Sequence, residues 1–166
     1  MSGNIAIGIQ DFSTIIQGNY FYIDKTPFIK EWWDCGDSAT LITRPRRFGK
    51  TLTMSMVEQF FSIDYAGRSD LFEHLAIWKE EKYRELQGTY PVISLSFARI
   101  KERDYEKTKQ KMCEVLRNIY IKFCYIKDSE KLTDADRAYY ERMLEENIKE
   151  TDATSSLYQL SDFLYR

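Results

Sequence analysis

The sequence is poor in residues that several classes of protein need. It contains one histidine, His74, so a histidine metal site or a Ser-His-Asp triad has almost no material. Its three cysteines, Cys35, Cys113 and Cys124, are odd in number and widely spaced, which favours reduced thiols over a disulfide framework or a zinc knuckle. No apolar run approaches the roughly 20 residues of a membrane-spanning helix, and no secretory signal pattern opens the chain. We therefore expect a cytoplasmic protein without membrane contact.

The composition is that of a globular protein without excess positive charge. Hydrophobic residues make up 43% of the 166 positions and charged residues 30%, whereas a disordered chain would have fewer apolar residues. The formal net charge of -2 argues against a wholly basic nucleic-acid binder. A chain of this length is expected to form one domain.

Apolar spacing and capping residues predict helices and two short strands. Pro27 after Thr26 predicts the start of a helix, and Gly36 predicts its end. The apolar, β-branched runs 39–43 and 92–97 predict strands, the first of them buried in a parallel sheet. The alternation of strand and helix indicates an α/β fold. Helical spacing predicts further helices over about 50–61, after Ser69, and over about 104–125, 133–149 and 153–166.

Residues 43–51, with the sequence TRPRRFGKT, carry the clearest chemical signal. They lie between a predicted strand and a predicted helix, where backbone N–H groups and the helix N-terminus form an anion cradle. Gly49 would let the backbone approach phosphates, Lys50 would reach the β- and γ-phosphates, and the Thr51 hydroxyl would bind Mg²⁺. The alternative is a solvated basic loop, but the strand and helix around it favour phosphate binding.

Four segments together resemble a known family, the AAA-ATPase-like proteins of bacteria and archaea. The segments are 7–12 (IGIQDF), 22–26 (YIDKT), 41–51 (LITRPRRFGKT) and 90–97 (YPVISLSF). The resemblance starts near Ile7 and covers almost all of the chain. Arg44 occupies the first glycine position of the general phosphate-loop pattern, and arginine is usual there in this family.

The resemblance implies a P-loop NTPase fold of the AAA/ASCE-like, three-layer α/β kind, and ATP with Mg²⁺ as ligands. Lys50 is the expected catalytic residue, and Thr51 is the expected metal ligand. Arg46 and Arg47 could also contact a neighbouring subunit's nucleotide or a nucleic-acid backbone. The residues expected to bind the nucleotide are Arg46, Arg47, Phe48, Gly49, Lys50, Thr51 and Leu52.

The family also implies a Walker B strand that ends in Asp-Glu, and no such strand is present in this sequence. The chain therefore resembles the N-terminal part of the family's ATPase domain, with segments 1–37, 38–97 and 98–166. Its sheet is expected to be incomplete and followed by a helical C-terminal part, with unpaired strand edges that favour self-association. Members are usually coupled to a nuclease-like domain of the PD-(D/E)XK class, through which the parent protein could meet nucleic acid.

Two further alternatives remain open at this stage. Residues 20–25 could line the adenine side of the pocket, or Asp24 and Thr26 could cap the helix that follows, which we favour. The function could be ATP hydrolysis, or nucleotide binding as a switch or interaction module without turnover.

The missing Walker B acid generates a prediction about turnover. We expect the 166-residue chain to release phosphate from ATP slowly or not at all, because nothing obvious completes the Mg²⁺ shell or orients water. The measurement is a phosphate-release assay on the wild type and Lys50→Ala. Robust turnover that depends on Lys50 would show that a catalytic acid is present in the chain.

Overall fold

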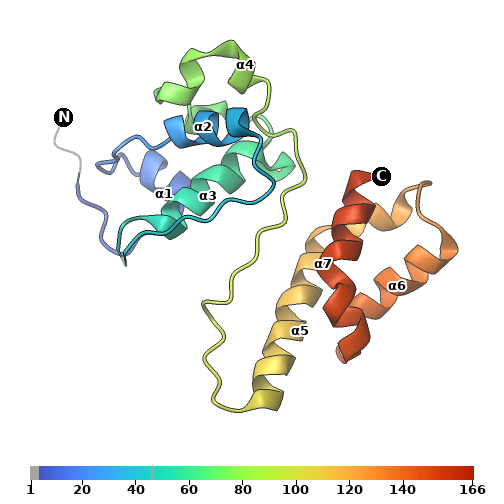
Figure 1. The fold of residues 1–166 in the computed structure, drawn as a ribbon. Helices are drawn as coiled ribbons and strands as arrows, with labels where there is room; N and C mark the ends of the chain where they lie inside the picture. Colours follow the sequence, from blue (N-terminus) through green and yellow to red (C-terminus); the bar gives the residue numbers. More distant parts are fainter. Residues whose placement is uncertain (1–3, 46) are drawn as a thin grey trace. The chain divides into compact units, whose positions relative to one another are not determined.

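The computed structural model describes residues 4–45 and 47–166, which form helices joined by coil. The chain divides into two compact units, Met1–Val92 and Ile93–Arg166, and each is described by itself. The first unit contains α1 (Phe12–Gln17), α2 (Pro27–Cys35), α3 (Lys50–Phe61), η1 (Ile63–Tyr65), η2 (Ser69–Leu71), η3 (Ala76–Lys79) and α4 (Glu81–Arg84). The second contains α5 (Tyr105–Lys122), η4 (Cys124–Asp128), α6 (Asp134–Leu144) and α7 (Glu150–Tyr165) (Figure 1).

The core of the first unit forms around the buried face of α3. Met56 and Phe60 of this helix are fully buried. The Phe60 ring packs edge-on against Phe72, with centroids 5.1 Å apart, and Phe72 stacks on Phe12 of α1 at 5.1 Å. Aromatic pairs of this kind add about 0.5–1.5 kcal/mol to the free energy gained from area burial. The aromatic cluster thus fixes α1 and the η2 region against α3.

Polar contacts at the start of α1 reinforce this packing. The Asp11 carboxylate caps α1 by accepting the backbone N–H of Thr14 at 2.8 Å. Its other oxygen accepts a hydrogen bond from the Gln59 amide at 2.6 Å, and the N–H of Phe12 donates to the Ser55 hydroxyl at 3.0 Å. Because Ser55 and Gln59 lie on α3, the helix cap also connects the two helices.

The second unit is a three-helix arrangement with a tyrosine-rich core. Each of α5, α6 and α7 packs against the other two, and Figure 1 shows α6 and α7 beside α5. The buried hydroxyls are satisfied by backbone carbonyls, because Tyr140 donates to Tyr120 O at 2.6 Å and Tyr120 donates to Ser156 O at 2.7 Å. Helix α6 begins with a capping box between Thr133 and Asp136.

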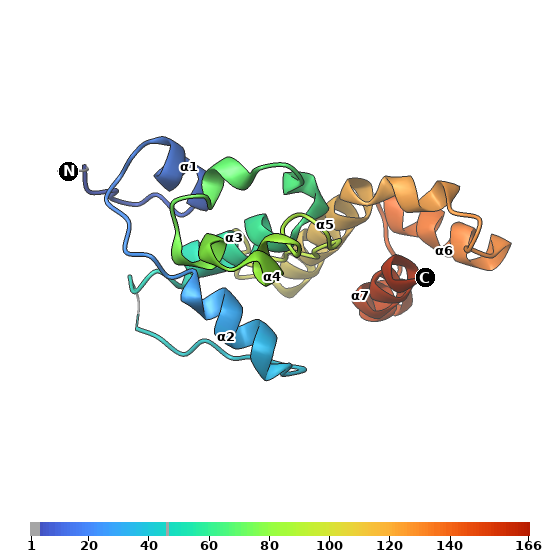
Figure 2. The same ribbon diagram turned by 90° about the horizontal axis from the view of Figure 1, so that it is seen from above.

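The predicted α/β three-layer P-loop fold is wrong for the part of the chain that the structure describes, where no residue lies in a β-strand. Residues 39–43 and 92–97 are coil, and Figure 2 shows 38–45 as a coil between α2 and α3. A strand requires a neighbouring backbone to complete its hydrogen-bond ladder, and the one bridge among described residues joins Ser62 and Tyr90. Leu41, expected to be buried, is 85% exposed.

Most of the predicted helices are confirmed, with shifts at their ends. However, α6 ends at Leu144 and not near 149, and the segment after the predicted cap Ser69 forms only the short 3-10 helix η2. Helix α3 has the expected bounds, α2 ends before Gly36, and α5 begins directly after its cap, Asp104. None of the described helices is both long and apolar enough to cross a membrane.

The contact between Asp11 and Gln59 generates a pH-dependent prediction. Burial alone would raise the pKa of Asp11, but hydrogen bonds from Ser13, Thr14 and Gln59 outweigh it and hold the pKa below its usual value. A lowered pKa means that the carboxylate stabilises the fold above the pKa of the unfolded chain, and that this stabilisation is lost as pH falls through the folded pKa. We expect Asp11→Asn to lower the free energy of unfolding by about 1 kcal/mol near neutral pH, and by less below about pH 4, because an amide accepts hydrogen bonds through one oxygen where the carboxylate accepts through two.

The measurement is urea unfolding followed by tryptophan fluorescence, because all three tryptophans lie in the first unit. Asp37→Asn is the matched control, since Asp37 is an exposed carboxylate of the same unit and should leave stability unchanged. An Asp11→Asn effect of equal size at pH 7 and about pH 3 would contradict the assignment.

Candidate functional site

The loop before α3 turns on a glycine in the left-handed conformation. Gly49 is the N-cap of α3 with φ 74° and ψ 23°, and its carbonyl accepts the first helical hydrogen bond, from Thr53 N at 2.8 Å. This region of φ and ψ carries little penalty for glycine and about 1–2 kcal/mol for other residues. The glycine of the Gly-Lys-Thr sequence therefore sets the direction in which the helix begins.

The N-terminus of α3 is open to an anion. No side chain caps it, and its first turn contains no acidic residue. The first N–H groups of a helix have no intrahelical partner and carry the positive end of the helix dipole. Lys50 and Thr51, the first two helical residues, are both exposed beside these groups.

The Lys50 side chain closes over its own loop. Its ammonium donates to the carbonyl oxygen of Arg44 at 2.5 Å, so it spans the loop from the helix back to the position before Pro45. The Lys50 side chain is therefore in direct contact with the backbone of the loop. Leu52, in the next position, is half-buried and packs against the core of the first unit.

The remaining predicted ligands lie in the turn itself. Arg47 has a positive φ of 69° and an exposed side chain, and the Phe48 side chain is 60% exposed. Arg46 lies outside the described residues. The side chains of Arg47 and Phe48 are accordingly exposed to solvent. Among the described residues, no contact joins Arg47 to Lys50.

A second lysine reaches the loop from the segment before α2. The Lys25 ammonium lies 3.4 Å from the carbonyl oxygen of Phe48. It would be 2.6 Å from a Cβ atom placed on Gly49. From the sequence, residues 20–25 are predicted to line the adenine side of the pocket or to cap the next helix. Their spacing along the chain does not reveal the contact of Lys25 with the loop before α3.

The neighbours of Lys25 have structural roles. Asp24 accepts hydrogen bonds from Thr26 N at 2.8 Å and Thr26 Oγ1 at 2.7 Å through one oxygen, and from Ala76 N at 2.7 Å through the other. Thr26 is the N-cap of α2 as expected, but its side chain makes no capping bond and instead accepts from Ile77 N at 3.1 Å. Asp24 and Thr26 therefore fasten the start of α2 to η3.

No cluster of protein ligands for a metal accompanies the loop. Within 4–45 and 47–166, no group of three or more His, Cys, Asp and Glu side chains is placed to hold a metal ion. A Mg²⁺ ion at this loop would therefore take the Thr51 hydroxyl together with phosphate oxygens and water, the usual preference of this ion.

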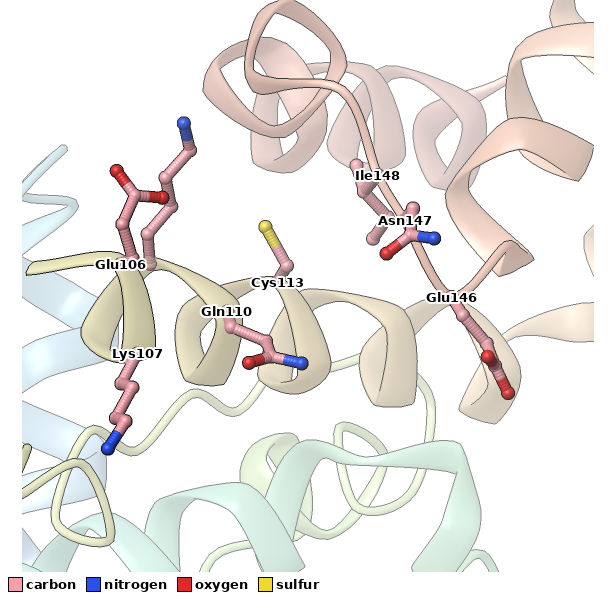
Figure 3. Close-up of a pocket in the computed structure, with 8 residues that line it drawn as sticks. Glu106, Lys107, Gln110, Cys113, Glu146, Asn147 and Ile148 are labelled. Atoms are coloured by element: carbon pink, nitrogen blue, oxygen red, sulfur yellow. The ribbon is translucent and has the colours of Figure 1, made fainter.

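The second unit contains a shallow pocket of about 300 Å³. It lies between α5, which contributes Glu106, Lys107 and Cys113, and residues 146–148 between α6 and α7. Figure 3 shows side chains of both signs spread along its walls without convergence on one point. Its mixed charge and open form do not define a ligand.

Comparisons with known proteins agree with the resemblance seen in the sequence. A protein from Azotobacter chroococcum mcd 1, described as "Uncharacterized protein in vnfD 5'region", is 33% identical over 113 residues. The match covers 68% of this chain and 20% of that relative, so the chain spans about a fifth of its length. No solved structure matches the chain significantly. The profile of the AAA-ATPase-like family, described as "Predicted AAA-ATPase", matches residues 6–159, and the chain belongs to this family.

Proposed function

We propose that the chain binds ATP with Mg²⁺ through residues 44–52. The observation that carries the proposal is the left-handed Gly49 at the uncapped N-terminus of α3, followed at once by Lys50 and Thr51. Helix N–H groups and an ammonium donate hydrogen bonds to the oxygens of a triphosphate, and a hydroxyl oxygen binds its metal ion. The description of the family supports the same ligand.

The residues of the loop have separate roles in this proposal. The amides at the start of α3 hold phosphate oxygens, and Lys50 exchanges its bond to Arg44 O for the terminal phosphates, where it would stabilise developing charge. Thr51 holds Mg²⁺, which when bound neutralises phosphate charge. Arg47 and Phe48 line the exposed side of the nucleotide, and Leu52 anchors the helix in the core. Arg46 is kept as a phosphate ligand on the sequence alone.

The activity of the whole protein is a further step of the proposal. The chain spans about a fifth of the length of its relative, so we infer ATPase activity only for the whole protein, to which this chain contributes the nucleotide-binding loop. Hydrolysis then needs groups beyond those of the loop. The alternative for this chain alone is nucleotide binding without turnover, as a switch or a signal for self-association.

The first prediction concerns the charge of Lys50. We expect Lys50→Ala to weaken ATP binding by about tenfold to a hundredfold, because a charge-assisted hydrogen bond contributes about 1.5–3 kcal/mol. The fold should remain intact, since Lys50 is exposed. The measurement is ATP-induced stabilisation followed by tryptophan fluorescence, with Lys79→Ala as a control at an exposed lysine of the same unit. Equal stabilisation of wild type and Lys50→Ala by ATP would refute the assignment.

The second prediction concerns the backbone at Gly49. We expect Gly49→Ala to weaken ATP binding and to destabilise the first unit by about 1 kcal/mol, because alanine is strained at this positive φ. Gly36→Ala is the matched control, since Gly36 has φ 64° at the end of α2 and open space around its Cβ position.

The two variants should lose similar stability, but only Gly49→Ala should lose ATP affinity. Equal ATP affinities of Gly49→Ala and Gly36→Ala would show that the loop conformation is not needed for binding. Isothermal titration calorimetry provides the affinities, and urea unfolding provides the stabilities.

A further inference from the structure

We propose that Lys25 is a second cationic ligand of the nucleotide phosphates and reaches the loop from the segment before α2. The inference rests on the proposed function of the loop and extends it to a residue outside the Gly-Lys-Thr sequence. Lys25 and the loop both belong to the first compact unit, so their contact lies within one body.

The position of the Lys25 ammonium is the first argument. It lies 3.4 Å from Phe48 O, the carbonyl just before Gly49. It is also so close to the Gly49 backbone that a Cβ atom there would be 2.6 Å from it. The absent side chain of glycine thus leaves room for the Lys25 ammonium. Lys25 therefore stands beside the residue whose backbone the phosphates must approach.

The backbone of Lys25 is held in place by hydrogen bonds on both sides. Its N–H donates to the Tyr22 hydroxyl at 3.3 Å, and its carbonyl accepts from Phe28 N at 3.0 Å in the first turn of α2. Burial raises the pKa of Tyr22 to about 12, so this hydroxyl stays protonated at neutral pH. The preceding residue, Asp24, is fixed by three hydrogen bonds. The side chain extends toward the loop from a fixed base.

The Lys25 ammonium differs from two other lysines of the first unit in having no carboxylate partner among the described residues. Lys30 and Lys82 of the same unit form ion pairs with Glu80 and Asp34, at 2.5 Å and 2.8 Å. Among the described residues, Lys25 forms no such pair, and its bond to the neutral Phe48 carbonyl is long. When a nucleotide binds, the Lys25 ammonium would donate to a phosphate oxygen in place of the Phe48 carbonyl. A charged acceptor makes a shorter and stronger hydrogen bond than a neutral one.

A purely structural role for Lys25 makes a different prediction. A lysine that only fastens the loop to the start of α2 would stabilise the protein without nucleotide, and its loss would weaken ATP and AMP binding alike. A phosphate ligand acts on the phosphate chain, so its loss should weaken ATP and ADP binding more than AMP binding. The ratio of the ATP and AMP affinities therefore separates the two roles.

The experiment compares Lys25→Met, which keeps the length of the side chain without its charge, with Lys25→Arg, which keeps the charge. Mg²⁺ with ATP, ADP or AMP is titrated by calorimetry into both variants, the wild type, Lys50→Ala and the control Lys79→Ala. We expect Lys25→Met to weaken ATP binding about tenfold and AMP binding less than twofold, with Lys25→Arg within about threefold of the wild type.

Three results would overturn the inference. If Lys25→Met binds ATP as tightly as the wild type while Lys50→Ala loses binding, the proposed function holds and Lys25 is not a ligand. An unchanged ratio of ATP to AMP affinity, with a lower unfolding midpoint in the absence of nucleotide, would assign Lys25 a structural role. Failure of the wild type to bind ATP would refute the proposed function and the inference together.

Discussion

The structure of the first unit depends on one constraint: α3 must be buried at one end and open at the other. Met56 and Phe60 are fully buried, whereas Lys50 and Thr51 are exposed at the N-terminus of α3, where no side-chain cap is described. Burial of a large apolar side chain contributes about 1.5–3 kcal/mol, so the second half of the helix can hold it in place. The first turn is then free to use its N–H groups for a ligand.

The segments that carry the family resemblance meet around this helix. Asp11 of the first segment binds Gln59, and Tyr22 of the second packs its ring on Phe12 at 5.5 Å. The fourth segment begins at Tyr90, whose N–H donates to Phe61 O at 2.8 Å at the end of α3. Positions far apart in the sequence therefore share one task, which is to hold α3 and the residues beside it.

The sequence predicts local features of the protein better than distant ones. Pro27 and Gly36 at the ends of α2, and apolar spacing along 50–61, locate helices because their signals act within a few residues. The run 39–43 predicted a buried strand, yet a strand is stable only beside a partner, and Leu41 lies exposed in a coil. The loop is predictable from its motif, whereas the approach of Lys25 to Gly49 joins positions 24 residues apart through tertiary packing.

The central claim is that the first turn of α3 and its loop form the nucleotide site. Hydrogen exchange of the chain with and without Mg²⁺ and ATP tests it most directly, because amides that bind phosphate exchange more slowly. The account predicts slower exchange over residues 47–53 and unchanged exchange in α5, α6 and α7. Unchanged exchange over 47–53 with saturating nucleotide, or protection confined to the second unit, would contradict it.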